Sequence, residues 1–363
     1  MIWLSLFCIS CDSSWNNPYP RQESNQSIYY DSFSERPKHL DPVSSYSSNE
    51  YVFLGQIYEP PLQYHFLKRP YELIPLTATY LPRAIYVDKN GEELSENSKP
   101  EDIDSVKYII SIKPGILFQP HPAFAKDKNN NYLYHNLEIS DLKHVNTLAD
   151  FNNTGTRELA ASDYIYQIKR MAHPRIHSPI AGLMEKYILG LDEFSETLKN
   201  IDKTKLGKRF LDLNEYPLSG VKLIDKYTFE IVLKEKYPQF LYWLSMSFFA
   251  PMPWEADLFY SQEGLTEKNI SLDWYPVGTG PFMLTENNPN RRMVLERNPN
   301  FRGEAYPIDG EEADLNVGLL EDSGKQMPFI DKAIYSLEKE SIPAWNKFLQ
   351  GYYDTSGIVS DSF

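Results

Sequence analysis

Hydrophobic and polar positions along the chain follow two periods, and both predict regular structure. Residues 108–112 (YIISI) form an apolar run that ends before a Pro-Gly pair, which predicts a strand followed by a turn. Residues 221–224 and 228–233 flank an Asp-Lys pair, and Phe229, Ile231 and Leu233 fall on one face of the second segment. We therefore expect a β-hairpin over residues 221–233.

Helical spacing occurs in three other segments. Ser162 is expected to cap one helix, and Ser178, followed by a proline, is expected to cap a second helix with an apolar stripe that runs to Leu191. A last helix is predicted from about residue 342, with its core side chains at Trp345, Phe348 and Leu349. Strands mixed with helices predict an α/β protein.

Two segments could be mistaken for ligand sites. Residues 240–244 (FLYWL) are mostly aromatic, but their helical spacing favours a place in the core. Residues 303–328 are rich in glycine and acidic residues, and their spacing is a poor match to a calcium-binding loop. We expect a solvated surface loop there.

The N-terminal residues have the pattern of a targeting segment. Residues 2–10 are mostly apolar, too few to cross a bilayer, and resemble the core of a signal peptide. Ser10 before Cys11 resembles a lipobox, so we expect residues 1–11 to be a signal and Cys11 to carry a lipid that tethers the protein to the inner membrane. No basic residue precedes Arg21, so a stray apolar N-terminus is the alternative. Residues 12–27 are polar and contain proline, which predicts a tether.

Length and charge narrow the class of function. The 363 residues predict two or three domains. The net charge of −14 and the lack of a basic stripe argue against nucleic-acid binding and fit a soluble monomer. Both cysteines, Cys8 and Cys11, lie in the apolar N-terminal run, where a redox or metal-binding pair is not expected.

A search for catalytic motifs finds no nucleophile elbow, zinc-protease helix or Walker loop. Gly278, Thr279, Gly280 and Pro281 are better explained as a turn or hinge than as a phosphate cradle. His173 and His177 are four residues apart, but Pro174 breaks the helical geometry that a shared metal needs. We expect no metal or cofactor. Distant carboxylate pairs leave a glycosidase open.

Several stretches resemble, in order, segments typical of one protein family. Residues 276–282 (PVGTGPF), continued by 294–301 (VLERNPNF), are the most specific of them. The others are 40–42 (LDP) with 57–62 (IYEPPL), 108–118, 162–170, 220–233 and 329–332. Together they resemble the family 5 extracellular solute-binding proteins, which are the oligopeptide-, dipeptide- and nickel-binding components of ABC transporters.

The resemblance implies a periplasmic-binding-protein-like fold with two α/β lobes around a cleft and an extra inserted domain. Residues 28–75 and 201–285 would form lobe one, and 76–200 the inserted domain. Residues 286–363 would begin a second lobe that is truncated, since full-length members of the family continue well past Phe363.

The resemblance also implies a function. The protein would not be an enzyme but would capture peptides or similar small solutes in the periplasm for import by an ABC permease in the inner membrane. Its expected ligand contacts are Ser44, Ser45, Tyr46, Ser47 and Tyr275, and 278–281 would lie at the crossover between the lobes. The alternatives are a secreted hydrolase that acts on peptides or glycans, and a truncated remnant that binds nothing.

Overall fold

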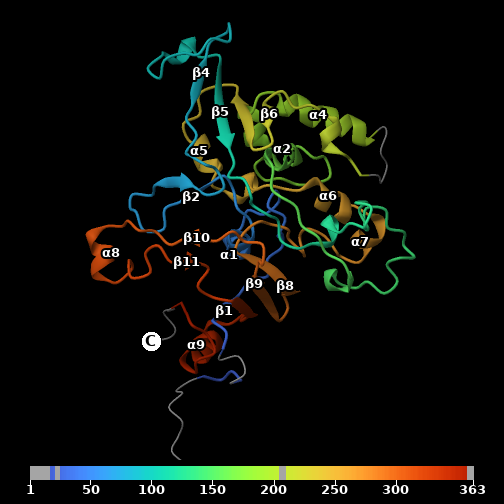
Figure 1. The fold of residues 1–363 in the computed structure, drawn as a ribbon, viewed down its shortest axis with the longest axis vertical. Helices are drawn as coiled ribbons and strands as arrows, with labels where there is room; N and C mark the ends of the chain where they lie inside the picture. The colour runs from blue at the N-terminus through green and yellow to red at the C-terminus, as the bar shows by residue number, and fades with distance from the viewer. Residues whose placement is uncertain (1–16, 21–24, 204–209, 358–363) are drawn as a thin grey trace, which may run out of the picture.

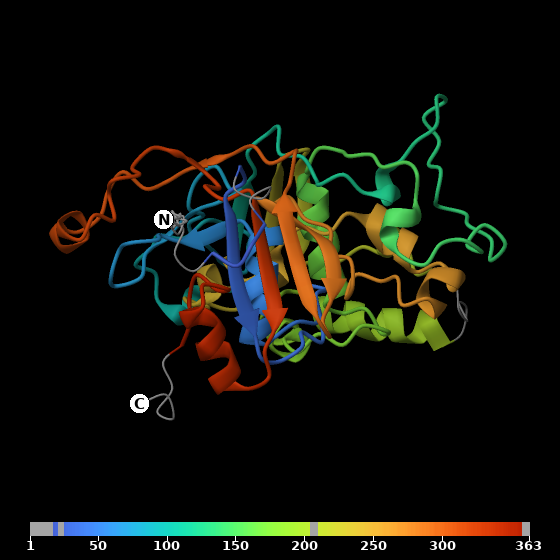
Figure 2. The same ribbon diagram turned by 90° about the horizontal axis from the view of Figure 1, so that it is seen from below.

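Two four-stranded sheets organise the described part of the chain (Figures 1 and 2). The computed structural model describes residues 17–20, 25–203 and 210–357. The first sheet has the order β1-β12-β9-β8, with β1 parallel to β12, and the second has the order β4-β5-β7-β6. Their strands are β1 (Ile28–Phe33), β8 (Phe282–Asn288), β9 (Arg292–Arg297), β12 (Lys332–Leu337), β4 (Ile85–Val87), β5 (Ser105–Ser111), β6 (Val221–Asp225) and β7 (Thr228–Leu233).

Helix α1 (Ser48–Ile57) packs against the first sheet through Phe53. The ring of Phe53 is fully buried, with its centroid 6.0 Å from that of Phe33 on β1 and 5.1 Å from that of Tyr335 on β12. Edge-on aromatic pairs of this kind fix the helix on the sheet, because each ring adds burial and a favourable ring–ring geometry.

The second sheet follows the predicted alternation. On β5, Val106, Tyr108 and Ile110 are buried and the residues between them are half-buried, as period-two spacing requires. Tyr164 of α2 (Ala161–Arg170) stacks on Phe229 at 5.4 Å, and Phe240 of α5 (Phe240–Trp243) lies 5.1 Å from Tyr108. The predicted strand and hairpin are therefore confirmed, with α2 and α5 packed on their buried side chains.

The predicted helix from Ser178 to Leu191 is wrong as a single element. The structure has α3 (Ala181–Tyr187) and α4 (Leu191–Ile201), so Ser178 lies before the first helix. Gly190 breaks the path because its φ of 72° lies in the left-handed region, which favours glycine. A Cβ there would lie 2.0 Å from Ser219 Oγ, so a larger residue would also have to displace that hydroxyl.

Two other helix predictions need correction. Helix α2 begins at Ala161, where the Asp163 carboxylate accepts the Ala160 amide at 2.9 Å, so Ser162 is not the cap. Helix α9 (Ser341–Leu349) exists, but it buries none of its residues. Trp345 and Phe348 are half-buried against each other at 5.5 Å, and Leu349 is exposed.

Residues 303–328 are largely exposed, as expected, but contain short regular elements. Strands β10 (Glu304–Ala305) and β11 (Gln326–Met327) pair, and α8 (Glu312–Asn316) lies between them in an arm that extends from the body (Figure 2). The arm meets the hairpin of β2 (Leu62–Tyr64) and β3 (Leu73–Pro75), where Lys68 Nζ lies 2.7 Å from the Asp309 carboxylate.

Each sheet draws strands from two of the expected parts of the chain. Strands β4 and β5 fall in 76–200 but pair with strands from 201–285, and β9 and β12 fall in 286–363 but share a sheet with β1. The division into lobes and an inserted domain therefore remains a prediction. Of the helices that the structure describes, none is long and apolar enough to cross a membrane.

Candidate functional site

A groove lies at the N-terminus of α1, where two distant parts of the chain meet. One wall is the segment 45–48, and the other is the segment 245–248 that follows α5. The groove has a volume of about 580 Å³, and its remaining lining residues are Tyr51, Tyr64 and Trp243. None of these side chains carries a charge. We refer to these residues as the aromatic groove.

The three tyrosine rings of the groove, Tyr46, Tyr51 and Tyr64, are open to solvent. Tyr46 is 73% exposed, and its ring centroid lies 6.0 Å from that of Phe248 on the opposite wall. Tyr64 stacks on Tyr242 at 6.4 Å. Exposed rings in a concave surface offer apolar contact area at little entropic cost, which is typical of ligand-binding clefts.

Glu50 on α1 holds the wall formed by residues 45–48. Its carboxylate accepts hydrogen bonds from the Ser45 hydroxyl at 2.7 Å and from the amides of Lys38 and His39 at 2.9 Å each. Burial opposes the charge, but these hydrogen bonds outweigh it and hold the pKa of Glu50 below its usual value. The loop is thus tied to the first turn of α1 by an ionised side chain.

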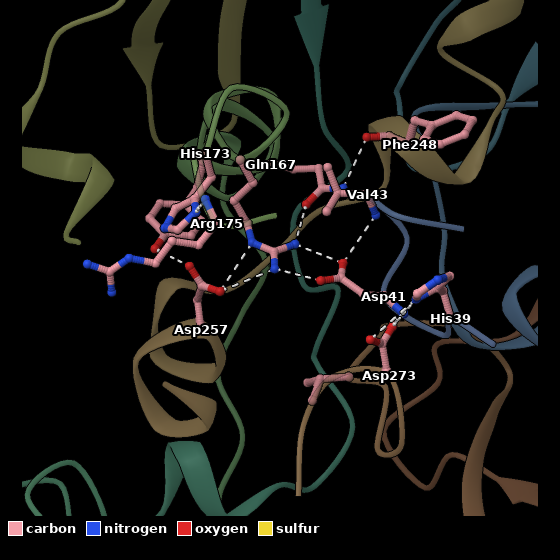
Figure 3. A network of polar contacts seen from close by, with 12 residues as sticks. His39, Asp41, Val43, Gln167, His173, Arg175, Phe248, Asp257 and Asp273 are labelled. Carbon is pink, nitrogen blue, oxygen red and sulfur yellow. Dashed lines mark hydrogen bonds and ion pairs between the residues drawn. The ribbon is translucent and has the colours of Figure 1, made fainter. Parts of the chain in front are cut away.

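A buried network of polar contacts connects the segments that lead to the two walls (Figure 3). Arg170 at the end of α2 donates to both oxygens of Asp41, at 2.9 and 2.8 Å, and to Asp257 at 3.2 Å. Asp41 in turn accepts the Val43 amide at 3.1 Å, just before the first wall. One turn earlier on α2, the Gln167 amide donates to the Phe248 carbonyl at 3.1 Å on the second wall. Helix α2 therefore sets the spacing of the groove.

The positive charge of Arg170 is balanced by the carboxylates of Asp41 and Asp257. Burial opposes its charge, but Asp257 of α6 (Trp254–Tyr260) and Asp41 outweigh burial and raise the pKa of Arg170 well above its usual value. Asp257 also accepts the Tyr166 hydroxyl at 2.8 Å. A buried charge with this many partners supports the fold rather than binding a ligand.

The segment 278–281 packs tightly against the end of α1. The Gly280 amide donates to the Ile57 carbonyl at 2.8 Å, and a Cβ on Gly278 would lie 1.9 Å from that same oxygen. The Thr279 hydroxyl donates a hydrogen bond to the buried Glu59 carboxylate at 2.9 Å. The same carboxylate accepts a hydrogen bond from Arg302 at 2.7 Å. Glycine is required here because the two backbones touch.

Residues 149–362 match the family described as bacterial extracellular solute-binding proteins, family 5 middle. The chain belongs to this family. It is 28% identical over 294 residues to the periplasmic oligopeptide-binding protein OppA of Escherichia coli, a stretch that covers 74% of this chain and 48% of OppA. It is 30% identical over 198 residues to OppA of Salmonella typhimurium, which covers 51% of this chain and 32% of that protein. The chain thus spans half or less of these curated relatives.

Solved structures of periplasmic binding proteins share the fold of this chain. The periplasmic binding protein DppA of Helicobacter pylori, in complex with a peptide, has a TM-score of 0.54 at 17% identity, over 92% of this chain and 47% of DppA. OppA of Burkholderia pseudomallei has a TM-score of 0.53 at 15% identity, over 92% of this chain and 46% of that one. The predicted α/β fold of the family 5 proteins is confirmed.

Three of the five predicted ligand residues of this family 5 chain line the groove, namely Ser45, Tyr46 and Ser47. Ser44 lies beside them, with its amide bonded to the Asp41 carbonyl at 3.0 Å. Tyr275 does not join them. It is half-buried away from the groove, and its carbonyl accepts the Tyr260 hydroxyl at 2.7 Å.

The sequence did not indicate the second wall. Phe240 and Leu244 are buried as expected, but Tyr242 is 45% exposed and Trp243 lines the groove. Helix α5 has only four residues, so its buried and exposed side chains lie within a single turn. Spacing alone therefore does not show which of its side chains belong to the core and which line a groove. Cys8 and Cys11 lie outside the described residues. Within the described ranges, no three His, Cys, Asp or Glu side chains are grouped to hold a metal ion.

Proposed function

We propose that this chain forms a peptide-binding surface of an ABC-transporter solute-binding protein and that the aromatic groove contacts the peptide. The main support for this proposal is the groove itself, which is uncharged and open. One of its walls is the segment that follows Leu-Asp-Pro. The exposed segment 46–48 suits hydrogen bonding to an extended peptide, and the rings suit contact with its side chains. The similarity to two oligopeptide-binding proteins supports the ligand class.

The proposal is tested by thermal unfolding of the purified chain with pools of di- to pentapeptides. Peptide at about 100 times its Kd stabilises the folded state by about 2.7 kcal/mol, which raises the Tm by a few degrees. The Tyr46→Ala variant should lose most of this shift, whereas Tyr80→Ala, a matched exposed tyrosine that does not line the groove, should keep it. An unchanged Tm with every peptide pool would contradict the proposal.

We also propose a periplasmic location with a lipid on Cys11, binding without catalysis, delivery to an inner-membrane permease, and a monomer. The support is the N-terminal sequence pattern and the family. Mass spectrometry of protein extracted from its own membrane fraction should show a diacylglycerol-sized addition, which Cys11→Ser should abolish while Cys8→Ser should not. Release of cleaved peptides by the purified protein would instead support the hydrolase alternative.

The segment 278–281 is proposed as the crossover between lobes. Its support is the tight packing of Gly278 and Gly280 on the last carbonyls of α1, which couples α1 to β8. Lobe closure around this point would move α1 and the first sheet as one body.

A further inference from the structure

A second, smaller cavity adjoins the floor of the aromatic groove. The two share Tyr51, Tyr64, Ser245 and Ser247 as lining residues, so the smaller cavity is a side pocket of the groove. It has a volume of about 220 Å³. An apolar cavity of about 150 Å³ is enough to hold a benzene molecule, so this pocket has room for an aromatic ring.

One part of the wall of the side pocket is apolar and buried. Leu54, Tyr58, Leu62 and Leu76 line it, and each is at least nine-tenths buried. Side chains that are packed this closely resist displacement. No Lys, Arg, Asp, Glu or His lines the pocket.

Polar atoms of the pocket are largely engaged elsewhere. The Ser245 hydroxyl donates to the Tyr242 carbonyl at 2.7 Å, the Tyr58 hydroxyl accepts the Val277 amide at 3.3 Å, and the Gln63 amide donates to Glu304. A charged side chain that entered the pocket would lose its hydration without gaining an opposite charge, which is costly.

Gly55 keeps this pocket open. It lies inside α1, where glycine costs about 1 kcal/mol relative to alanine, and its φ is not in the left-handed region. A Cβ at this position would meet the Tyr51 ring at 3.4 Å, which is an ordinary contact, so backbone packing does not require glycine. A larger side chain here would instead occupy space in the pocket that Gly55 and Tyr51 line.

We propose that the side pocket receives one bulky apolar side chain of the bound peptide, aromatic or branched aliphatic, and excludes charged side chains at that position. This inference rests on the proposed peptide-binding function and adds a ligand preference to it. Gly55 is the specificity-determining residue because it has no side chain to occupy the pocket that it lines.

The test is calorimetric titration of the purified chain with tetra-alanine and with its variants that carry Phe, Leu, Glu or Lys at each position in turn. At one position, Phe or Leu should bind at least 10-fold more tightly than Ala, and Glu and Lys should bind no more tightly than Ala. Gly55→Leu should bring the Phe peptide to within about 2-fold of the Ala peptide. Gly55→Ala, the matched control, should keep most of the preference, and thermal unfolding verifies that both variants fold.

The outcomes separate the two proposals. Equal affinity for all peptides, or a preference that Gly55→Leu leaves intact, overturns the side-pocket inference while peptide binding stands. No binding of any peptide overturns both. If Gly55→Leu does not fold, the side-chain preference of the unsubstituted protein still decides the question.

Discussion

Glu50 shows how one residue can position a wall of the aromatic groove without lining the groove itself. Its carboxylate accepts hydrogen bonds from the Ser45 hydroxyl and two backbone amides, and Glu50 is 3% exposed. Because the hydrogen bonds require the ionised form, the pKa of Glu50 is lowered. The loop therefore depends on the charge of Glu50.

Replacing Glu50 with glutamine should weaken both the fold and the groove. We expect the free energy of unfolding to fall by about 1–3 kcal/mol, since a charged acceptor of several buried donors becomes neutral. The stability that Glu50 contributes is present above its usual pKa of 4.5 and is lost as pH falls through its lower folded pKa. Urea unfolding at pH 7 and pH 3 measures this. A Glu50→Gln protein with the same pH dependence as the unsubstituted one would contradict the role.

His121 should make the fold sensitive to mild acid. It is fully buried, its Nδ1 accepts the Ala123 amide at 3.1 Å, and burial lowers its pKa from 6.5 to about 3. Because the unfolded chain takes up the proton first, stability is full above pH 6.5 and is lost as pH falls toward 3. We expect a loss of about 3 kcal/mol between pH 7 and pH 4 from this residue.

The His121→Asn variant isolates that contribution, since its amide oxygen can still accept the Ala123 amide. Its unfolding free energy should depend less steeply on pH between 7 and 4. His173, whose pKa burial lowers to about 4, titrates in both proteins and cancels in the comparison. Parallel pH profiles for the two proteins would show that His121 is not the sensitive group.

At the scale of elements, α2 is both a cover for the second sheet and the spacer of the groove. Tyr164 packs on the sheet, Gln167 holds the Phe248 wall, and Arg170 holds Asp41 before the other wall. A single helix thus fixes two surfaces that are about 200 residues apart in the sequence. Its loss of position would widen the groove as well as loosen the core.

Arg170→Ala should therefore be strongly destabilising. Asp41 and Asp257 would be left buried without their cation, and breaking a buried ion pair in this way costs about 3–5 kcal/mol. Lys325→Ala is the control, because its pair with Asp322 is exposed and should change stability by less than about 1 kcal/mol. Chemical unfolding of both variants checks this. Equal effects of the two substitutions would rule out the network as a source of stability.

Local patterns predicted the elements whose structure is set locally. The alternation in β5 and in the hairpin of β6 and β7 follows from strands with one buried face. The break at Gly190 was missed because the hydrophobic spacing continues across it, although its φ of 72° ends the helical path. Likewise, the resemblance indicated Ser45–Ser47 in the groove, but nothing local indicated Tyr64 or Trp243, because the groove exists only after distant segments meet.

At the scale of the whole molecule, the first sheet combines a strand near the start of the described chain with a strand near its end. Strand β12 lies between β1 and β9, and Ile28 pairs with Lys332. The second sheet, in contrast, is complete by residue 233. The two sheets should therefore differ in how they respond to shortening of the chain.

A chain that ends at residue 330 tests this difference. It lacks β12, so β1 loses its neighbour in the sheet, while β5 and β7 keep theirs. We expect amide hydrogen exchange to show β1 unprotected and β5 protected. Protection of β1 in the shortened chain would mean that another segment replaces β12.

The placement of β12 also has a consequence for the time course of synthesis. A ribosome adds about 5–20 residues per second, so about 15–60 s separate the emergence of β1 from that of its partner. During this interval β1 has no β12 to pair with. Pairing of the two strands then closes a loop of about 300 residues, which is entropically unfavourable and slow. The nascent chain thus keeps its first strand open for docking until nearly the last of the described residues has been made.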